Sequence, residues 1–462
     1  MEYLNRCLDV DKNFDVIYRE ITIGGKSACM YLIDGFCKDE LMQKLLQYFM
    51  DQKKEDMPGN CQEFAKQMTP YVEVETQGDC EKMIQALLTG VFVLIIDGYE
   101  EALLLDSRTY PARGVEEPEK DKVLRGSKDG FVETVVCNAA LIRRRIRSTK
   151  LHMEIMNAGE VSKTDIVLCY MSDRVDGEFL AAIRRKIQEI RVDSLTMNQE
   201  SLAECLYQRK WYNPFPKFKY TERPDTAAAE ILDGKIVLLT DNSPAVMILP
   251  VSVFDIMEEA DDFYFPPVTG TYLRVTRFVI ALLTLLLTPT WLLFLQNPQW
   301  IPPQFAFIKI SGDLYVPVFA QLLILEFAID GLKLAAINTP GMLTMPLSVI
   351  AGLVVGEFAV QSGWFNAETM LYMAFVAIAN YTQASYELGY ALKFMRILML
   401  ILTAIFGLAG YAAGLVITFL SLLLNRTVSG ESYLYPLIPF DGKQFCRRIF
   451  RKRIRFDINL KE

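Results

Sequence analysis

Histidine is almost absent from this chain of 462 residues, which has only His152. Its nine cysteines occur singly, without the Cys-x-x-Cys pair or the Cys/His spacing of a metal site. No arrangement of serine, cysteine and histidine suggests a catalytic nucleophile with its base. These absences give no indication of an enzyme, a metal site or another cofactor, and we expect none of the three.

A surplus of positive charge is also missing, since the formal net charge is -8. Such a chain lacks the broad cationic face that binds phosphates, so we expect no nucleic-acid partner. The start of the chain has no apolar run typical of a signal peptide. Gly-Gly-Lys-Ser at 24–27 is no phosphate-binding loop, because Glu20 stands where its first glycine is needed. Most cysteines precede the apolar half, which favours reduced thiols facing a cytoplasm.

Apolar and charged residues are both frequent, at 52% and 23%, and they are segregated along the chain. Charged and apolar residues mix up to about Asp262, whereas long apolar runs dominate from about Tyr272 to Leu424. We therefore predict an α+β cytosolic amino-terminal region with two α/β-like subdomains, followed by an α-helical polytopic membrane domain. The expected parts are a first subdomain (1–60), a polar linker (61–80), a second subdomain (81–265), the membrane domain (266–425) and a basic tail (426–462).

Local patterns predict several elements of the soluble part. Two β-rich runs joined across Asp97-Gly98 predict a hairpin, and a second strand–turn–strand pattern covers 233–250. A buried strand is expected over 164–171, followed by a helix over 177–190. The arginine-rich stretch 139–159, which contains His152, predicts a basic helix.

The membrane part contains five apolar segments, at about Tyr272–Leu295, Leu314–Ile337, Leu343–Gln361, Met370–Tyr386 and Ile397–Leu424. The first, third and fifth have the ~20 residues that a span needs. Arg274 and Arg277 before the first span, and the basic run Cys446–Arg455 after the last, place both ends inside. Two inside ends need an even number of crossings, so one segment should not span. The candidates are the second segment and the fourth, which contains Asn380 and Gln383.

Three charges interrupt the second segment. Glu326, Asp330 and Lys333 are four and three residues apart, so they share one face of a helix. Each would cost about 2.5–3.5 kcal/mol at the centre of a bilayer, so this face must contact protein or water. Either Lys333 neutralises Asp330 in a packed interface, or the face lines an aqueous path between several copies. Glu357 is a further pore candidate, unless it lies at the membrane surface.

Other residues have both a structural and a functional interpretation. The pairs Gly352/Gly356 and Gly410/Gly414 are candidates for close helix packing, although glycine is common in membrane helices generally. Trp291 and Trp300 are expected to anchor the chain at a membrane surface. The run Cys446–Arg455 is first of all a topology signal, and binding of anionic lipid headgroups is the alternative.

Three motifs together resemble one family. They are the run "EPEKDKVLRGSKDGFVETVVCNAALIRRRIRSTKL" at 117–151, "TERPD" at 221–225, and "DGKIVLLTDNSPAVMILP" at 233–250. In this order, before a membrane domain, they resemble the A-subunit class of the GerA-type spore germination proteins. "YELGYALKFMR" at 386–396 and the run at 338–365 are more similar to the stage V sporulation protein AF subgroup than to nutrient-receptor subunits.

The resemblance implies a non-enzymatic, multi-pass protein of the endospore inner membrane, with both ends on the spore core side. It further implies a homo-oligomer, in the form of a ring, with an ion-conducting role in germination, surrounding membrane lipid and small membrane partner proteins. The resemblance favours the pore or gate interpretation of Glu326, Asp330 and Lys333, and Glu357, Asn380 and Gln383 are the further pore or gate candidates. A non-conducting scaffold is the main alternative; a transporter is weakened by the lack of an internal repeat.

The resemblance also bears on the arginine-rich stretch. Its candidates for contact with an acidic surface of a neighbouring subunit are Arg143, Arg144, Arg145 and Arg147. A solvated charged face is the alternative for these four. Arg125, Gly126, Gly130 and Glu133 are expected to form a tight turn, since glycine permits backbone angles that other residues resist.

Overall fold

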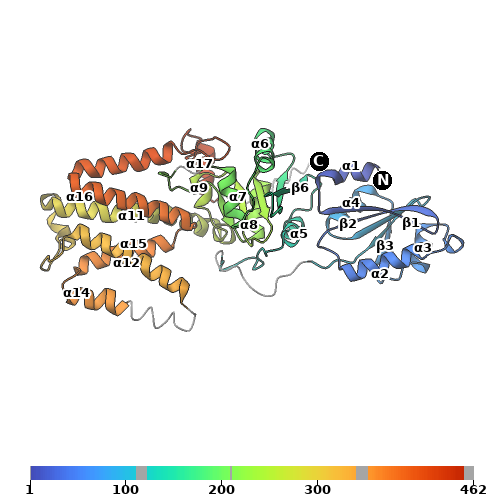
Figure 1. The fold of residues 1–462 in the computed structure, drawn as a ribbon, viewed down its shortest axis with the longest axis horizontal. Coiled ribbons are helices and arrows are strands. Elements are labelled where there is room, and N and C mark those ends of the chain that lie inside the picture. The colour runs from blue at the N-terminus through green and yellow to red at the C-terminus, as the bar shows by residue number, and fades with distance from the viewer. Residues whose placement is uncertain (1, 111–121, 209–210, 340–351, 452–462) are drawn as a thin grey trace. The chain divides into compact units, whose positions relative to one another are not determined.

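The computed structural model describes residues 2–110, 122–208, 211–339 and 352–451. The chain divides into two compact units (Figure 1). The first unit consists of Met1–Arg209 and Phe218–Pro250, and the second of Lys210–Lys217 and Val251–Glu462. The first unit is α+β and the second is helical, as the sequence predicts.

The first unit begins with an antiparallel five-stranded sheet in the order β1-β2-β4-β5-β3. Its strands are β1 (Val16–Ile23), β2 (Lys26–Ile33), β3 (Val74–Gln77), β4 (Phe92–Ile96) and β5 (Ala102–Leu105). Its helices are α1 (Glu2–Leu8), α2 (Asp39–Met50), α3 (Cys61–Gln67) and α4 (Cys80–Leu88). Side chains of β2 alternate between two cores: Tyr31 joins the core with α4, and Met30 the core with α2. Because both faces are covered, β2 is apolar and buried from Ala28 to Ile33.

The predicted hairpin across Asp97-Gly98 is confirmed as β4 and β5. Gly24 and Gly25 form the turn between β1 and β2, with φ of 54° and 75°. The expected linker 61–80 is instead part of this subdomain, because it contains α3 and β3, and β3 pairs with β5. Its polar composition reflects an edge strand with no fully buried residue.

A second antiparallel sheet follows, in the order β6-β7-β9-β10-β8. Its strands are β6 (Leu151–Ala158), β7 (Thr164–Met171), β8 (Lys219–Thr221), β9 (Ile236–Thr240) and β10 (Val246–Leu249). Its helices are α5 (Val135–Arg145), α6 (Gly177–Gln188), α7 (Asn198–Leu206) and α8 (Pro224–Leu232). The expected strand 164–171, the helix from residue 177 and the β9–β10 pair are confirmed.

The prediction of one basic helix over 139–159 is wrong in its second half. Helix α5 ends at Arg145, and the following residues form β6, which pairs along its whole length with β7. His152 therefore lies in a strand, where it is buried beside Tyr170. Tertiary pairing with β7 decides the conformation here, as it commonly does for short segments.

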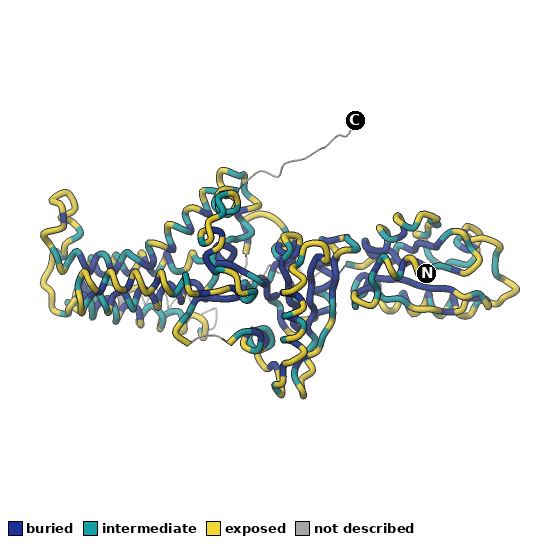
Figure 2. Tube along the Cα trace, turned by 90° about the horizontal axis from the view of Figure 1, so that it is seen from above, coloured by how far each residue is buried: buried dark blue, intermediate teal, exposed yellow. Residues whose placement is uncertain are grey.

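The helical unit comprises the remaining described elements. They are α9 (Val253–Ile256), α10 (Asp261–Tyr264), α11 (Pro267–Gln296), η3 (Pro298–Trp300), η4 (Pro303–Ile308), α12 (Val318–Asn338), the π-helix η5 (Gly352–Phe358), α14 (Ala359–Gln361), α15 (Ala367–Tyr381), α16 (Tyr386–Leu423) and α17 (Gly442–Ile449). Among the described helices, α11 and α16 are long and apolar enough to cross a membrane. Buried and exposed residues alternate along the long helices of this unit (Figure 2).

A small core lies where α11, α12 and α15 meet. It contains Trp291, Leu322 and Met373. Trp291 is only 3% exposed and donates a hydrogen bond from Nε1 to the carbonyl oxygen of Ile308 at 2.9 Å. The expectation that Trp291 anchors the chain at a membrane surface is therefore wrong, because its ring is enclosed by protein.

Helix α16 reverses direction at Gly407, where φ is 57° and ψ is -131°. A Cβ added to Gly410 would lie 1.8 Å from the carbonyl oxygen of Leu402, and one added to Gly414 would lie 3.2 Å from Cα of Met399. The part after Gly407 thus folds back against the part before it. We call the parts of α16 before and after Gly407 its two legs. The expected single span Ile397–Leu424 is wrong, because it contains the end of the first leg and the whole of the second. Part of the expected segment Leu343–Gln361 lies outside the described residues.

Candidate functional site in the helical unit

The acidic residues of α12 meet two basic residues of α16. Glu326 accepts a hydrogen bond from Nε of Arg396 at 2.8 Å, and Nη2 of Arg396 forms an ion pair with the same carboxylate oxygen at 2.6 Å. Lys393 forms an ion pair with Asp330 and lies 3.5 Å from Oε2 of Glu326. Its ammonium also donates to the carbonyl oxygen of Glu326 at 3.2 Å. We call Glu326, Asp330, Lys333, Lys393 and Arg396 the charged cluster.

The centre of the charged cluster is closed to solvent. Glu326 and Arg396 are each 2% exposed, and Lys393 is 4% exposed. Arg396 also donates from Nη1 to the carbonyl oxygen of Thr284 at 2.9 Å, which connects α16 to α11. Buried charges of this kind are tolerated only with well-placed partners, and loss of one partner leaves the other uncompensated. The centre of the cluster therefore joins three helices.

Lys333 lies at the edge of the cluster and makes a different set of contacts. Its ammonium is 4.6 Å from the ring centre of Tyr381 and 5.6 Å from that of Tyr390, which are cation–π distances. The amide of Asn380 fits best with its oxygen accepting from Lys333 at 3.1 Å and its nitrogen donating to Gly389 at 3.0 Å. The ion pair between Lys333 and Asp330, one of the two interpretations of the sequence, is replaced by the pair between Lys393 and Asp330.

The charged cluster has one positive charge in excess, since three cationic side chains face two carboxylates. Among the described residues, Oδ1 of Asp330 is buried without a hydrogen-bond partner. Asp330 and Lys333 are half-buried, whereas Glu326, Lys393 and Arg396 are fully enclosed. The outer part of the cluster is thus less satisfied than its centre.

Glu357 is placed quite differently. It is exposed, lies in the π-helix η5 and accepts a hydrogen bond from Nε2 of Gln361 at 3.1 Å. In the described part of the chain no basic side chain forms an ion pair with it. Gln383, by contrast, makes a local bond to the carbonyl oxygen of Ala379 at 3.3 Å.

The two glycine pairs also differ. Gly410 and Gly414 are buried at the fold-back of α16, where a side chain would meet backbone or Met399. No described atom lies within 4 Å of a Cβ added to Gly352 or Gly356. Close packing of these two remains a prediction.

Three of the four arginines proposed for a subunit contact have side-chain partners within the chain. Arg143 is 1% exposed and binds both carboxylate oxygens of Asp15, at 2.6 and 2.9 Å, which joins the two sheets of the first unit. Arg145 pairs with Asp129 at 2.6 Å, and Arg144 lies 4.5 Å from the ring centre of Tyr110. Arg147 is exposed and donates to the carbonyl oxygen of Arg144.

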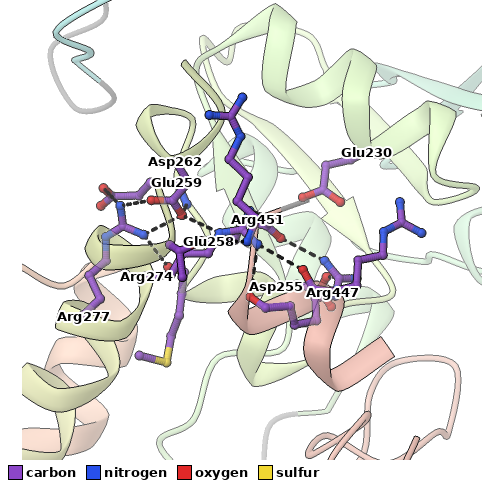
Figure 3. Close-up of polar contacts among 12 residues, drawn as sticks. Glu230, Asp255, Glu258, Glu259, Asp262, Arg274, Arg277, Arg447 and Arg451 are labelled. Atoms are coloured by element: carbon purple, nitrogen blue, oxygen red, sulfur yellow. Dashed lines mark hydrogen bonds and ion pairs between the residues drawn. The ribbon is translucent and has the colours of Figure 1, made fainter. Parts of the chain in front are cut away.

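Arg274, Arg277 and Arg448, which belong to the expected topology signals, lie in a second network, part of which Figure 3 shows. Arg277 binds Asp262 at 2.6 and 2.8 Å, and Arg274 approaches the same carboxylate at 3.3 Å. Arg448 of the tail helix α17 pairs with Asp255 at 2.7 Å. Arg274 also donates to the carbonyl oxygens of Arg447 and Arg448, at 3.3 and 3.1 Å, which fastens α17 to the beginning of α11.

Sequence reasoning missed Lys393 and Arg396, because they precede the expected span Ile397–Leu424. A signal was present: two basic residues three apart interrupt an apolar run, much as two acidic residues four apart interrupt α12. This spacing puts both basic residues on one face of a helix. It does not show which helix that face meets, so the interhelical pairs stay out of reach of the sequence.

Two of the described helices are long and apolar enough to cross a membrane, and they follow an α+β unit, an arrangement that indicates the class of membrane proteins. The chain belongs to the GerA family, because the family model described as Bacillus/Clostridium GerA spore germination protein matches residues 2–459. The resemblance seen in the sequence motifs is thereby confirmed. A role in spore germination and a place in a spore membrane follow from the family and the two apolar helices.

Similar proteins include the stage V sporulation protein AF of Bacillus subtilis (strain 168), 34% identical over 97% of this chain and 91% of that protein. Spore germination protein KA of the same organism is 25% identical over 96% of this chain and 82% of that one. Among solved structures, the N-terminal domain of the A subunit of the Bacillus megaterium spore germinant receptor GerK3 is 24% identical, with a TM-score of 0.40, over 54% of this chain and 92% of that one.

Proposed function

We propose that several copies of this chain form a ring in the spore inner membrane that conducts ions during germination. Glu357 would lie at the mouth of the pathway. The observation that supports this is the exposed Glu357 carboxylate, in an apolar segment and without a described cationic partner. A carboxylate in such a segment must face water or another protein chain.

A ring of copies would turn Glu357 into a ring of negative charge, which is how cation pores concentrate and select ions. The position fits a mouth rather than a midpoint, because Glu357 is four residues before the end of α14 at Gln361. Its π-helical backbone adds support, since such turns are frequent at functional sites.

The centre of the charged cluster is better suited to holding helices than to lining a path. Glu326 and Arg396 satisfy each other away from solvent, and an ion could not reach them without breaking a buried pair. Asp330, Lys333 and Asn380 at its edge remain candidates for a gate, because they are half-buried. We propose that movement between α12 and α16 would expose this edge.

The fold-back at Gly407 offers another way to obtain an even number of membrane crossings, which two ends on the same side require. If each leg of α16 crosses, and the four other apolar segments expected from the sequence also cross, six crossings result. Six is even, so both ends lie on one side, which we propose to be the spore core. No segment then needs to stay out of the membrane.

A non-conducting scaffold is the second candidate, favoured by the closed centre of the charged cluster. The experiment that separates the two is reconstitution of the purified full chain in liposomes, followed by measurement of monovalent-cation efflux. Efflux that depends on the protein supports conduction. No efflux, together with recruitment of other germination proteins to the same liposomes, would support the scaffold.

A further inference from the structure

The segment Lys210–Lys217 leaves the first unit and belongs to the helical unit, although the chain around it is part of the first. Its described residues, 211–217, contain two of the chain's aromatic residues side by side, Trp211 and Tyr212. We call 211–217 the strap. Because it is held by the helical unit, its position can be judged against the apolar helices.

Three contacts fasten the strap. Asn213 donates from Nδ2 to the carbonyl oxygen of Ser421, in the last turn of α16, at 3.2 Å. Phe215 is 4% exposed, and the centre of its ring lies 6.4 Å from the ring centre of the fully buried Tyr433. Lys217 donates to the carbonyl oxygen of Arg426 and lies 5.8 Å from the ring centre of Tyr433. The later half of the strap is therefore embedded in the unit.

The earlier half projects away from it. Trp211 is 95% exposed and Tyr212 is 60% exposed, with their rings edge to face at 6.0 Å. Exposure of a large aromatic ring to water is unfavourable. Two such rings on a segment held by other contacts therefore indicate that a binding partner or a lipid surface covers them. Tryptophan and tyrosine are enriched at the boundary between lipid and water, where the ring is shielded and its polar atom stays hydrated.

The strap lies at such a boundary. The last turns of α16 expose the apolar residues Phe419, Leu420 and Leu424. Directly afterwards the helix ends, Asn425 and Thr427 are buried polar residues, and Arg426 is exposed. A change from exposed apolar to polar and cationic side chains marks the end of a membrane helix, where arginine meets lipid phosphates. The bond from Asn213 to Ser421 holds Trp211 close to this level.

We infer that Trp211 and Tyr212 insert into the lipid–water interface of the bilayer around the end of α16, so that the strap anchors the polar part of the chain to lipid. The occupant of this surface is the bilayer itself, with Arg426 beside its phosphates. The inference rests on one part of the proposed function, namely that the helical unit spans a membrane. It is independent of ion conduction.

Tryptophan fluorescence tests this directly, because the chain has four tryptophans and all lie in the helical unit: Trp211, Trp291, Trp300 and Trp364. The full chain and its Trp211→Phe variant are reconstituted in phosphatidylcholine–phosphatidylglycerol vesicles, with or without lipids brominated in the upper part of their acyl chains. The difference between the two spectra is the emission of Trp211. We expect this difference to be blue-shifted, to lose about half its intensity in brominated bilayers, and to resist aqueous iodide.

Two results would overturn the inference. Iodide quenching of a red-shifted difference spectrum would place Trp211 in water. A blue-shifted difference spectrum without bromine quenching would place it against protein, for example a second copy of the chain. Trp291→Phe is the matched control: its ring is enclosed, so the emission it removes should be insensitive to both quenchers.

The remaining emission of the Trp211→Phe variant separates this inference from the proposed function. Trp300 and Trp364 are 42% and 59% exposed at other positions of the helical unit. If brominated lipid quenches this emission but not that of Trp211, the unit is in the bilayer and only the strap inference fails. If brominated lipid quenches neither, the unit is outside the bilayer, and both the inference and the proposed function fail.

Discussion

Glu326 on α12 accepts a hydrogen bond from Nε of Arg396 on α16 at 2.8 Å and forms an ion pair with its Nη2 at 2.6 Å, and both side chains are 2% exposed. The pair lies 70 residues apart in the sequence. Arg396 extends the contact to the backbone of α11 through Thr284. Three helices are therefore fixed to one another by one buried carboxylate and one guanidinium.

Removing one charge of this pair should destabilise the helical unit rather than change a pore. We expect Glu326→Gln to cost about 3–5 kcal/mol, because Arg396 would keep its burial and lose its counter-charge. Thermal aggregation of the detergent-solubilised protein measures the effect. The double variant Glu326→Leu/Arg396→Met should recover much of the loss, since it removes both charges. Full stability of Glu326→Gln would contradict the role assigned to the pair.

The fold-back of α16 should be sensitive to any side chain at Gly410. A Cβ there would lie 1.8 Å from the carbonyl oxygen of Leu402, so Gly410→Ala forces the two legs apart. We expect a loss of about 1–3 kcal/mol or more, as for other overpacked sites. Gly331→Ala on α12 is the control, because no described atom lies within 4 Å of a Cβ added there. Equal melting temperatures for the two variants would argue against the fold-back.

The stability of the first unit should depend on Arg143 but not on Arg147. Arg143→Met would leave Asp15 buried and unpaired, so we expect a loss of about 3–5 kcal/mol. Arg147→Met removes an exposed side chain and should change stability by less than about 0.5 kcal/mol. Pulse proteolysis in urea, followed by detection of the first unit, measures both. Matching urea midpoints would show that the Asp15–Arg143 pair does not hold the two sheets together.

Acid should weaken the first unit through Glu154. Burial opposes ionisation of this carboxyl, but hydrogen bonds from Arg184 and Tyr170 outweigh it, so the pKa of Glu154 lies below its ordinary value of 4.5. A depressed folded pKa stabilises the fold above the ordinary value, and this stabilisation is lost as pH falls through the folded pKa. We expect stability to fall less steeply below about pH 4.5 in Glu154→Gln than in the native chain. Parallel pH profiles from urea titrations would exclude this contribution.

Local patterns predicted the hairpin β4–β5, the strand β7 and the presence of three charges in α12. Long-range contacts decided the rest. Lys393 and Arg396 could not be assigned to Asp330 and Glu326 from one sequence, because nothing local shows which helices face each other. The reversal at Gly407 was missed since glycine is ordinary in an apolar helix, and only its φ of 57° marks it as a turn. The β6 strand was missed because its partner β7 determines its conformation.

Removing the charge of Glu357 is the most direct test of the proposed ion conduction. Full-length protein and its Glu357→Gln variant would be reconstituted in liposomes, and the rates of potassium and chloride efflux compared. Glu368→Gln is the matched control, because Glu368 accepts a hydrogen bond from the backbone of Ser311 at 3.1 Å in the same region of the unit. The account predicts a several-fold drop in the potassium-to-chloride ratio for Glu357→Gln alone. An unchanged ratio, with protein-dependent efflux intact, would contradict a Glu357 ring at the mouth of the pathway.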